Sequence, residues 1–96
     1  MVLEVATITV LPGHEDAFEA AYGQARPLVL GAQGCRSVRM TRGVESPSTF
    51  VLLIEWDSVQ AHEENFRAQP VFDQWRALIG PYFANPPHVE HFADVG

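Results

Sequence analysis

The residues best suited to chemistry lie between positions 56 and 76, where several aromatic side chains occur with one imidazole, that of His62, and the guanidinium of Arg76. A phenol or hydroquinone must lose a proton before it can pass an electron to molecular oxygen. His62, with an ordinary pKa of about 6.5, is the natural base for that step at neutral pH. Arg76 is permanently charged and can stabilise the resulting oxygen anion. Trp56 and Phe72 offer flat surfaces on which an aromatic ring can stack.

The spacing of this segment indicates that these side chains can meet. From His62, Phe66 follows one helical turn later, and the next segment repeats the same spacing up to Ile79. Apolar walls with a few polar groups are typical of pockets for small ligands. We therefore predict an aromatic cavity, with substrate-binding residues Trp56, Leu52, Asn65, Phe66, Phe72 and Trp75 and catalytic residues His62 and Arg76. Spacing alone favours the alternative, an ordinary aromatic core with His62 at its rim.

Other reactive groups in the chain do not form a recognisable site. The segment "HVEH" places His88 and Glu90 on one face of a strand and His91 on the other, which is poor geometry for one metal ion. Cys35 has no histidine nearby in the sequence to activate it, and we expect a small buried side chain. No glycine-rich phosphate loop or nucleophile elbow occurs. We expect no cofactor and no metal.

Composition narrows the class of protein. The 96 residues make one domain, 1–96, with 47% hydrophobic residues and a net charge of −6. This charge argues against a nucleic-acid partner, because no basic patch is available to neutralise phosphates. A lone cysteine excludes an internal disulfide, and no apolar run reaches the ~20 residues of a membrane span. We expect a soluble cytoplasmic domain that does not bind membranes.

Hydrophobic periodicity predicts the elements that must position these side chains. Strands are expected at 3–11, 35–44, 49–56 and 88–93, and helical segments at 15–30, from 57 or 58 onward, and at 70–79. Pro27 should kink or end the first helix. The order β-α-β-β-α-β predicts an α+β ferredoxin-like sandwich with a four-stranded antiparallel sheet and helices on one face.

The composition of the strand expected at 49–56 predicts that a second chain covers one face of the sheet. Its even positions, Phe50 to Trp56, are apolar, and Val51 and Leu53 on the opposite face are apolar too. An antiparallel strand with one wet face should alternate apolar and polar residues. Both faces are therefore expected to be covered, one by the helices and the other by a second copy of the sheet in a two-fold homodimer. A monomer with a mildly apolar surface is the alternative.

Nearly the whole chain resembles the antibiotic biosynthesis monooxygenase (ABM) family. The resemblance rests on "EVATITVLPGHEDAFEAAY", "GCRSVRM" and "EWDSVQAHEENFRAQPVFDQW", followed by "GPYFANPPHVEHF". The W-x-S-x-x-A-H core, the later GP and the PP-x-V-E-H end are its most specific parts. The resemblance implies a dimeric α+β barrel with a pocket between the sheet and the helices of each subunit. It also implies oxidation of aromatic polyketides or quinols by molecular oxygen without flavin, haem or metal.

The resemblance can be carried over to single positions. The pocket tryptophan of the polyketide-oxidising members falls on Trp56 and their arginine on Arg76. Their tyrosine falls on His62, which is a better base, and their strand asparagine falls on Leu52, which cannot hydrogen-bond. The haem-degrading branch fits worse, because its asparagine, tryptophan and axial histidine would fall near Thr7, Asn65 and Arg76.

Three functions stay open on the sequence alone. The first is a cofactor-independent monooxygenase that oxidises a quinol or an aromatic polyketide-type phenol with O2. The second is a non-catalytic dimeric barrel that binds a small hydrophobic metabolite or has only a structural role. The third is an isomerase or cyclase on the same scaffold, in which His62 transfers a proton without oxygen. Oxygen consumption separates the first from the other two.

Overall fold

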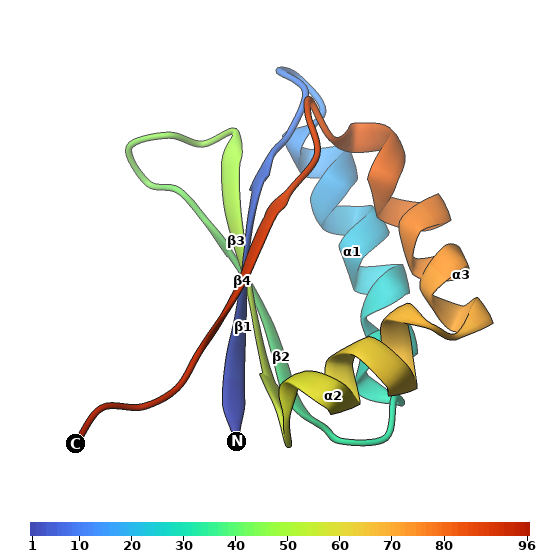
Figure 1. Cartoon of the computed structure of the whole chain (residues 1–96). Helices are drawn as coiled ribbons and strands as arrows, with labels where there is room; N and C mark the ends of the chain where they lie inside the picture. Colours follow the sequence, from blue (N-terminus) through green and yellow to red (C-terminus); the bar gives the residue numbers. More distant parts are fainter.

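A computed structural model describes residues 1–96 as one four-stranded antiparallel sheet with all its helices on one face (Figure 1). The strands are β1 (Val2–Thr9), β2 (Cys35–Arg42), β3 (Thr49–Trp56) and β4 (His88–Phe92), in the spatial order β2-β3-β1-β4. The helices are α1 (Glu15–Leu30), α2 (Val59–His62), the π-helical η1 (Glu63–Arg67), α3 (Pro70–Ile79) and the short 3₁₀ turn η2 (Gly80–Tyr82). The predicted β-α-β-β-α-β sandwich is confirmed.

The even positions of β1 and β3 build the core. Ala6 and Ile8 face the helices next to the paired residues Leu52 and Phe50, and all four are almost completely buried. Phe18 of α1 packs edge-on against Phe50, with 4.8 Å between the ring centroids. This alternation of buried and half-buried residues fixes the register, because a shift of one residue would turn the apolar set outward.

Local sequence explains where α2 begins. The Ser58 hydroxyl accepts a hydrogen bond from the backbone N–H of Ala61 and so caps the helix. Gly34, with a φ of +92°, lies against this turn, and a Cβ atom there would meet Ala61 Cβ at 2.8 Å. Gly34 also accepts a hydrogen bond from the Asp57 backbone N–H at 2.8 Å. The close approach that glycine allows sets the position of α2, and therefore of His62.

Helix α1 has the predicted bounds, but two details of the helices were not predicted. Helix α1 continues to Leu30, three residues beyond Pro27, and the Pro27 carbonyl still accepts a hydrogen bond from the Gly31 N–H. The proline therefore does not end the helix. In addition, α2 is followed by the π-helix η1, in which the Ala68 N–H donates to the Glu63 carbonyl five residues earlier. π-Helical turns often occur at functional sites, and this one carries Phe66 and Arg67.

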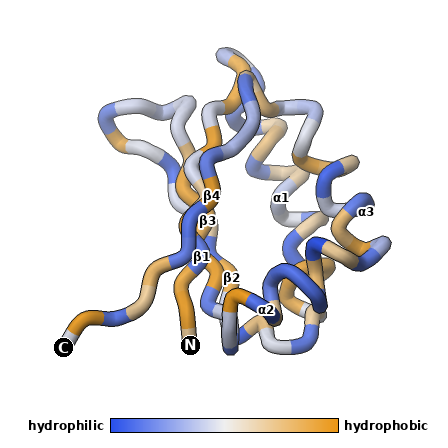
Figure 2. Tube along the Cα trace, viewed as in Figure 1, coloured by the Kyte–Doolittle hydropathy of each residue, from blue (hydrophilic) through white to orange (hydrophobic).

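The outer face of the sheet has no cover within the chain. Figure 1 shows the helices on one side of the sheet only, and Figure 2 shows apolar segments on the strands. Leu3 and Val5 of β1 lie on the outer face with Val51 and Leu53 of β3, and all four are only half-buried. Phe92 of β4, paired with Leu3, has 49% of its surface exposed. No helix is long and apolar enough to cross a membrane.

Candidate active site

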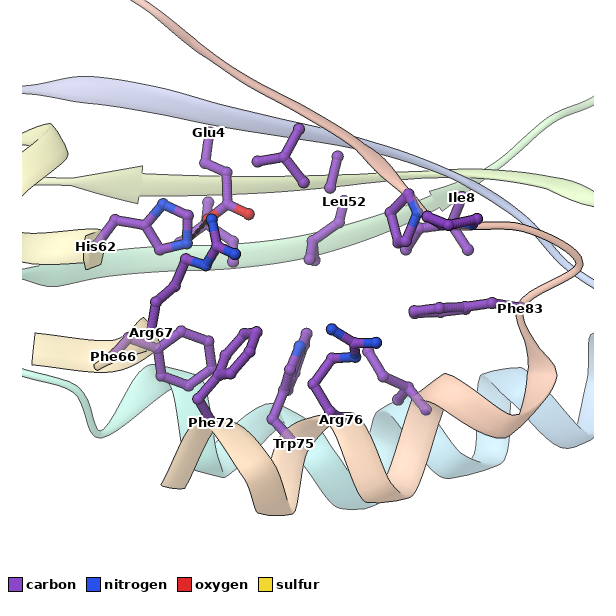
Figure 3. A pocket seen from close by; sticks show the side chains of 16 residues that line it. Glu4, Ile8, Leu52, His62, Phe66, Arg67, Phe72, Trp75, Arg76 and Phe83 are labelled. Atoms are coloured by element: carbon purple, nitrogen blue, oxygen red, sulfur yellow. Dashed lines mark ion pairs between the residues drawn. The ribbon is translucent and has the colours of Figure 1, made fainter. Parts of the chain in front are cut away.

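A cavity of about 270 Å³ lies between the sheet and the segment η1–α3, closed at one end by the chain that enters β4 (Figure 3). Ten of its sixteen lining residues are hydrophobic. The sheet contributes Glu4, Ala6, Ile8, Leu52, Ile54 and Val89; the helical segment contributes His62, Phe66, Arg67, Phe72, Trp75, Arg76 and Ile79; Phe83, Pro86 and Pro87 come from the connection to β4. The space suits one small, flat, mainly apolar ligand.

Most of the predicted pocket residues line this cavity. Leu52, Phe66, Phe72 and Trp75 form apolar or aromatic walls, and His62 and Arg76 are the predicted catalytic residues. Phe66 lies at the centre of the aromatic group, because both the Phe72 ring and the Trp75 ring meet it edge-on. Edge-on contacts of this kind hold aromatic walls in a defined shape.

Trp56 and Asn65 are placed elsewhere, so the prediction that they line the cavity is wrong. The Trp56 ring is completely buried and lies outside the lining. It stacks on His62 with 5.1 Å between centroids, and its Nε1 donates to Glu4 Oε1 at 2.9 Å. Trp56 thus supports two cavity residues from behind. Asn65 points away, and its Nδ2 donates to the Gln33 carbonyl at 2.7 Å.

The polar wall of the cavity consists of the two buried ionisable side chains in the protein, Glu4 and His62. Nε2 of His62 lies 3.3 Å from Glu4 Oε1, and Nδ1 of His62 lies 2.7 Å from His91 Nε2, a hydrogen-bond distance. A connected group of four side chains results, in the order Trp56, Glu4, His62 and His91. The half-buried His91 is its outermost member.

Burial moves the pKa values of Glu4 and His62 in opposite directions. Loss of solvent raises the pKa of Glu4; the Trp56 hydrogen bond and the positive charge of Arg67 lower it, and the negative charge of Glu63 raises it. Loss of solvent also lowers the pKa of His62 to about 4, helped by His91 and Arg67. His62 is therefore neutral at pH 7, and it is a weaker base than an exposed histidine.

Two guanidinium groups also border the cavity: that of Arg67 lies toward Glu4 and His62, and that of Arg76 lies on the helical side (Figure 3). Arg67 and Arg76 both lie over the Phe72 ring, with 5.6 Å and 5.9 Å from the guanidinium carbon to the ring centroid. Arg67 also lies 3.7 Å from Glu63, whereas Arg76 makes no ion pair. Arg76 can therefore bring a full positive charge to an anionic ligand atom.

One group of side chains has the composition of a metal site. Ligating atoms of His62, Glu63 and His91 lie within 4.8 Å of one another. However, the 2.7 Å between the two ring nitrogens is shorter than the ~3.3 Å that bond lengths of about 2.0–2.1 Å require of two nitrogens on one tetrahedral zinc. It is the distance of an N–H···N hydrogen bond. His88 and Glu90 contact each other at 2.7 Å and are exposed.

Sequence reasoning missed three polar members of the site. Glu4 is the only acidic residue within a strand of otherwise apolar residues and threonines, and it shares the parity of Ala6 and Ile8, which was a usable signal. Arg67 reaches the cavity from a π-helical turn that no periodicity indicates. His91 pairs with Glu4 across β1 and β4, a strand register that the sequence does not show.

Comparisons with known proteins identify the family. The model of the family described as "antibiotic biosynthesis monooxygenase" matches residues 1–78. The chain belongs to the ABM family. It is 35% identical over 95 residues to the uncharacterized Bacillus subtilis protein YczJ, a match that covers 99% of this chain and 100% of YczJ. ABM proteins share the dimeric α+β barrel fold.

Solved structures of similar proteins have the same fold. A provisionally named antibiotic biosynthesis monooxygenase from Bordetella bronchiseptica is 42% identical, with a TM-score of 0.94 over 98% of this chain and 96% of its own. A variant of SnoaB, a cofactor-independent oxygenase from Streptomyces nogalater, has a TM-score of 0.82 over 97% of this chain and 91% of its own. At 18% identity, this second likeness is one of fold alone.

Proposed function

We propose that this ABM protein is a cofactor-independent monooxygenase that oxidises a quinol or an aromatic polyketide-type phenol with O2. The observation that carries the proposal is the cavity itself, in which an apolar, aromatic space separates a proton-accepting wall from a cationic one. Glu4 and His62 form the first wall, and Arg76 belongs to the second. Membership of a family named for monooxygenases supports the same reaction class.

The chemistry follows from these two walls. A flat phenol between Leu52 and the aromatic side chains would place its hydroxyl group within reach of Glu4 and His62, and loss of the proton makes the ring electron-rich. Arg76 would stabilise the phenolate and the negative charge that develops on oxygen, because the mainly apolar walls of the cavity screen its charge less than water does. Electron transfer from the phenolate to O2 then needs no group beyond the substrate.

The test is oxygen consumption by the purified protein with anthrol and hydroquinone substrates. We expect uptake with the wild-type protein and slower uptake with Arg76→Ala, and Arg76→Lys should restore it only partly because an ammonium is not a planar donor. Arg36→Ala is a matched control, because Arg36 is exposed and pairs only with Asp57. Equal rates for Arg76→Ala and wild type would contradict the role of Arg76.

A proton-transfer isomerase or cyclase is the second candidate. The observation that favours it is the Glu4–His62 pair, which could move a proton between two substrate atoms without oxygen. Anaerobic turnover of a phenolic or enolic substrate would support it, and strict dependence on O2 would exclude it.

We further propose that two chains associate through the outer face of the sheet. The uncovered apolar residues Leu3, Val5, Val51 and Leu53 form a continuous patch across β1 and β3. A second copy of the same face would remove this patch from water and complete the barrel of the family.

A further inference from the structure

We propose that Glu4 carries the substrate's proton through the reaction: its carboxylate takes the proton from the substrate hydroxyl and later returns it to the peroxide. His62 and His91 are positioning residues for this carboxylate. The inference rests on the proposed function, and it assigns the base to a residue that the ABM resemblance did not indicate.

The geometry of the Glu4 carboxylate is the first argument. Oε1 accepts the Trp56 N–H at 2.9 Å and lies 3.3 Å from His62 Nε2, so this oxygen is occupied. Oε2 has no hydrogen-bond partner, yet no buried side-chain oxygen or nitrogen in the protein lacks one. Oε2 is therefore accessible, and because Glu4 lines the cavity, it is accessible from there. Figure 3 shows one Glu4 oxygen directed into the cavity.

The second argument concerns His62. Its Nδ1 is committed to His91 at 2.7 Å, and its Nε2 is beside Glu4 Oε1. The ring is stacked on Trp56 and on Phe66, which fixes its plane. Burial makes neutral His62 a poor base and makes the Glu4 carboxylate a better one than an exposed glutamate, because the pKa shifts are opposite. His62 is thus better suited to hold Glu4 than to take the proton.

The proton that the substrate loses is returned within the cavity. The substrate O–H bond breaks, its electron pair stays on the substrate oxygen, and the proton binds Glu4. The phenolate passes two electrons to O2, and one new carbon–oxygen bond forms to give a peroxide anion on the ring. Glu4 then returns its proton to the terminal peroxide oxygen. Phenol plus O2 gives a hydroperoxide, and Glu4 ends as the carboxylate with which it began. Loss of water from the hydroperoxide, with the hydrogen on the oxygenated carbon, then breaks the O–O bond and leaves one oxygen atom of O2 as a quinone carbonyl.

The charged surroundings of Glu4 come from several elements. Arg67 and Glu63 face it from η1, His62 from α2, and His91 from β4. Burial raises the pKa of the Cys35 thiol on β2, and the negative charge of Glu4 raises it further. Arg67 favours the carboxylate, whereas burial and Glu63 favour the protonated acid. A group balanced in this way can take up and release a proton within one turnover.

The first experiment uses 2-naphthol without oxygen turnover. This fluorescent phenol loses its proton in the excited state when a base is within reach, and the neutral and ionised forms emit at different wavelengths. We expect anion emission from 2-naphthol bound to the wild type, its loss in Glu4→Gln, and its retention in His62→Gln and in the control Glu64→Gln, whose carboxylate lies on the surface. The opposite pattern, or no binding of 2-naphthol by wild type, would overturn the proposal.

The second experiment measures oxygen uptake with an anthrol substrate. Glu4→Gln should lower kcat by about 10²- to 10⁴-fold with little change in KM, the usual effect of losing a positioned base. The acid limb of the wild-type pH profile should disappear in Glu4→Gln, and His91→Leu should shift that limb without changing KM. An acid limb that persists in Glu4→Gln and disappears in His62→Gln would make His62 the base and overturn the proposal.

A second variant, Glu4→Asp, covers the case in which Glu4→Gln does not fold. Glu4→Asp keeps the charge and withdraws the carboxylate from the cavity, so it replaces Glu4→Gln if the latter does not fold, and it should lose the same emission. The wild type could consume no oxygen with any phenol and still give anion emission from bound 2-naphthol that depends on Glu4. That result would refute the oxygenase function and support Glu4 as the base of the cavity. If Glu4→Gln consumes oxygen at the wild-type rate, Glu4 is not the base, and the proposed oxygenase function is unaffected.

Discussion

Acid should destabilise this protein through His62, and the size of the effect can be worked out from its burial. The unfolded chain binds a proton at this residue with a pKa near 6.5, whereas the folded protein does so only at about 4. Between these values the unfolded state holds more protons, so stability falls as the pH falls from 6.5 towards 4. A difference of about 2.5 pKa units corresponds to a loss of about 3 kcal/mol by pH 4.

Glu4 opposes this loss. Its folded pKa is raised, so in the acid range the folded state binds a proton before the unfolded state does. Stability from this group is present at low pH and is lost as the pH rises through the folded pKa. On acidification, protonation of Glu4 therefore offsets part of the stability that is lost through His62. The free energy of unfolding of the wild type should fall by less than the value calculated for His62 alone. Because the two groups lie 3.3 Å apart, their effects should not be additive.

The assay is urea unfolding at pH 7 and at pH 4, at constant protein concentration and ionic strength, followed by tryptophan fluorescence and circular dichroism. His62→Gln should lose about 3 kcal/mol less stability between the two pH values than the wild type, and Glu4→Gln should lose more than the wild type. Groups shared by all three proteins cancel in these differences. If His62→Gln and wild type lose equal stability on acidification, the assignment of His62 as a buried neutral imidazole is refuted.

Three further predictions follow from the fold and the cavity. Sedimentation at micromolar concentration should give about twice the chain mass, and a clean monomer would contradict the proposed dimer. Leu53→Glu on the outer face should dissociate or unfold the protein, since a charge in a dry interface costs several kcal/mol, whereas Val44→Glu in the exposed β2–β3 loop should have no effect. The purified protein should show no visible absorption from flavin or haem and no stoichiometric metal, and a chromophore bound at one per subunit would contradict cofactor independence.

The fold could be predicted from the sequence because its signals are local. The alternation in Thr49–Trp56, the cap at Ser58 and the Pro70 start of α3 each act within a few residues. The sequence did not reveal which face of β3 meets the helices, because both faces are apolar. The continuation of α1 past Pro27 and the π-helix η1 depend on tertiary packing, which overrides local preference.

The candidate site could be predicted only in part, for a physical reason. Helical spacing places His62, Phe66, Phe72 and Arg76 on one side of consecutive turns, and these residues line the cavity. Trp56 shares the face of the cavity residues but lies beneath His62, a difference in depth that strand parity cannot show. The contact between Glu4 and His62 joins residues 58 positions apart, and only the register of the folded sheet brings them together.

The most direct test of the proposed function is incorporation of labelled oxygen from ¹⁸O2 into an anthrol substrate by protein that is free of flavin, haem and metal. The account predicts one labelled oxygen atom in each product molecule, at a rate that falls sharply in Glu4→Gln and in Arg76→Ala but not in Arg36→Ala. No labelled product from any flat phenol or quinol, or a product that forms only after flavin or metal is added, would contradict it.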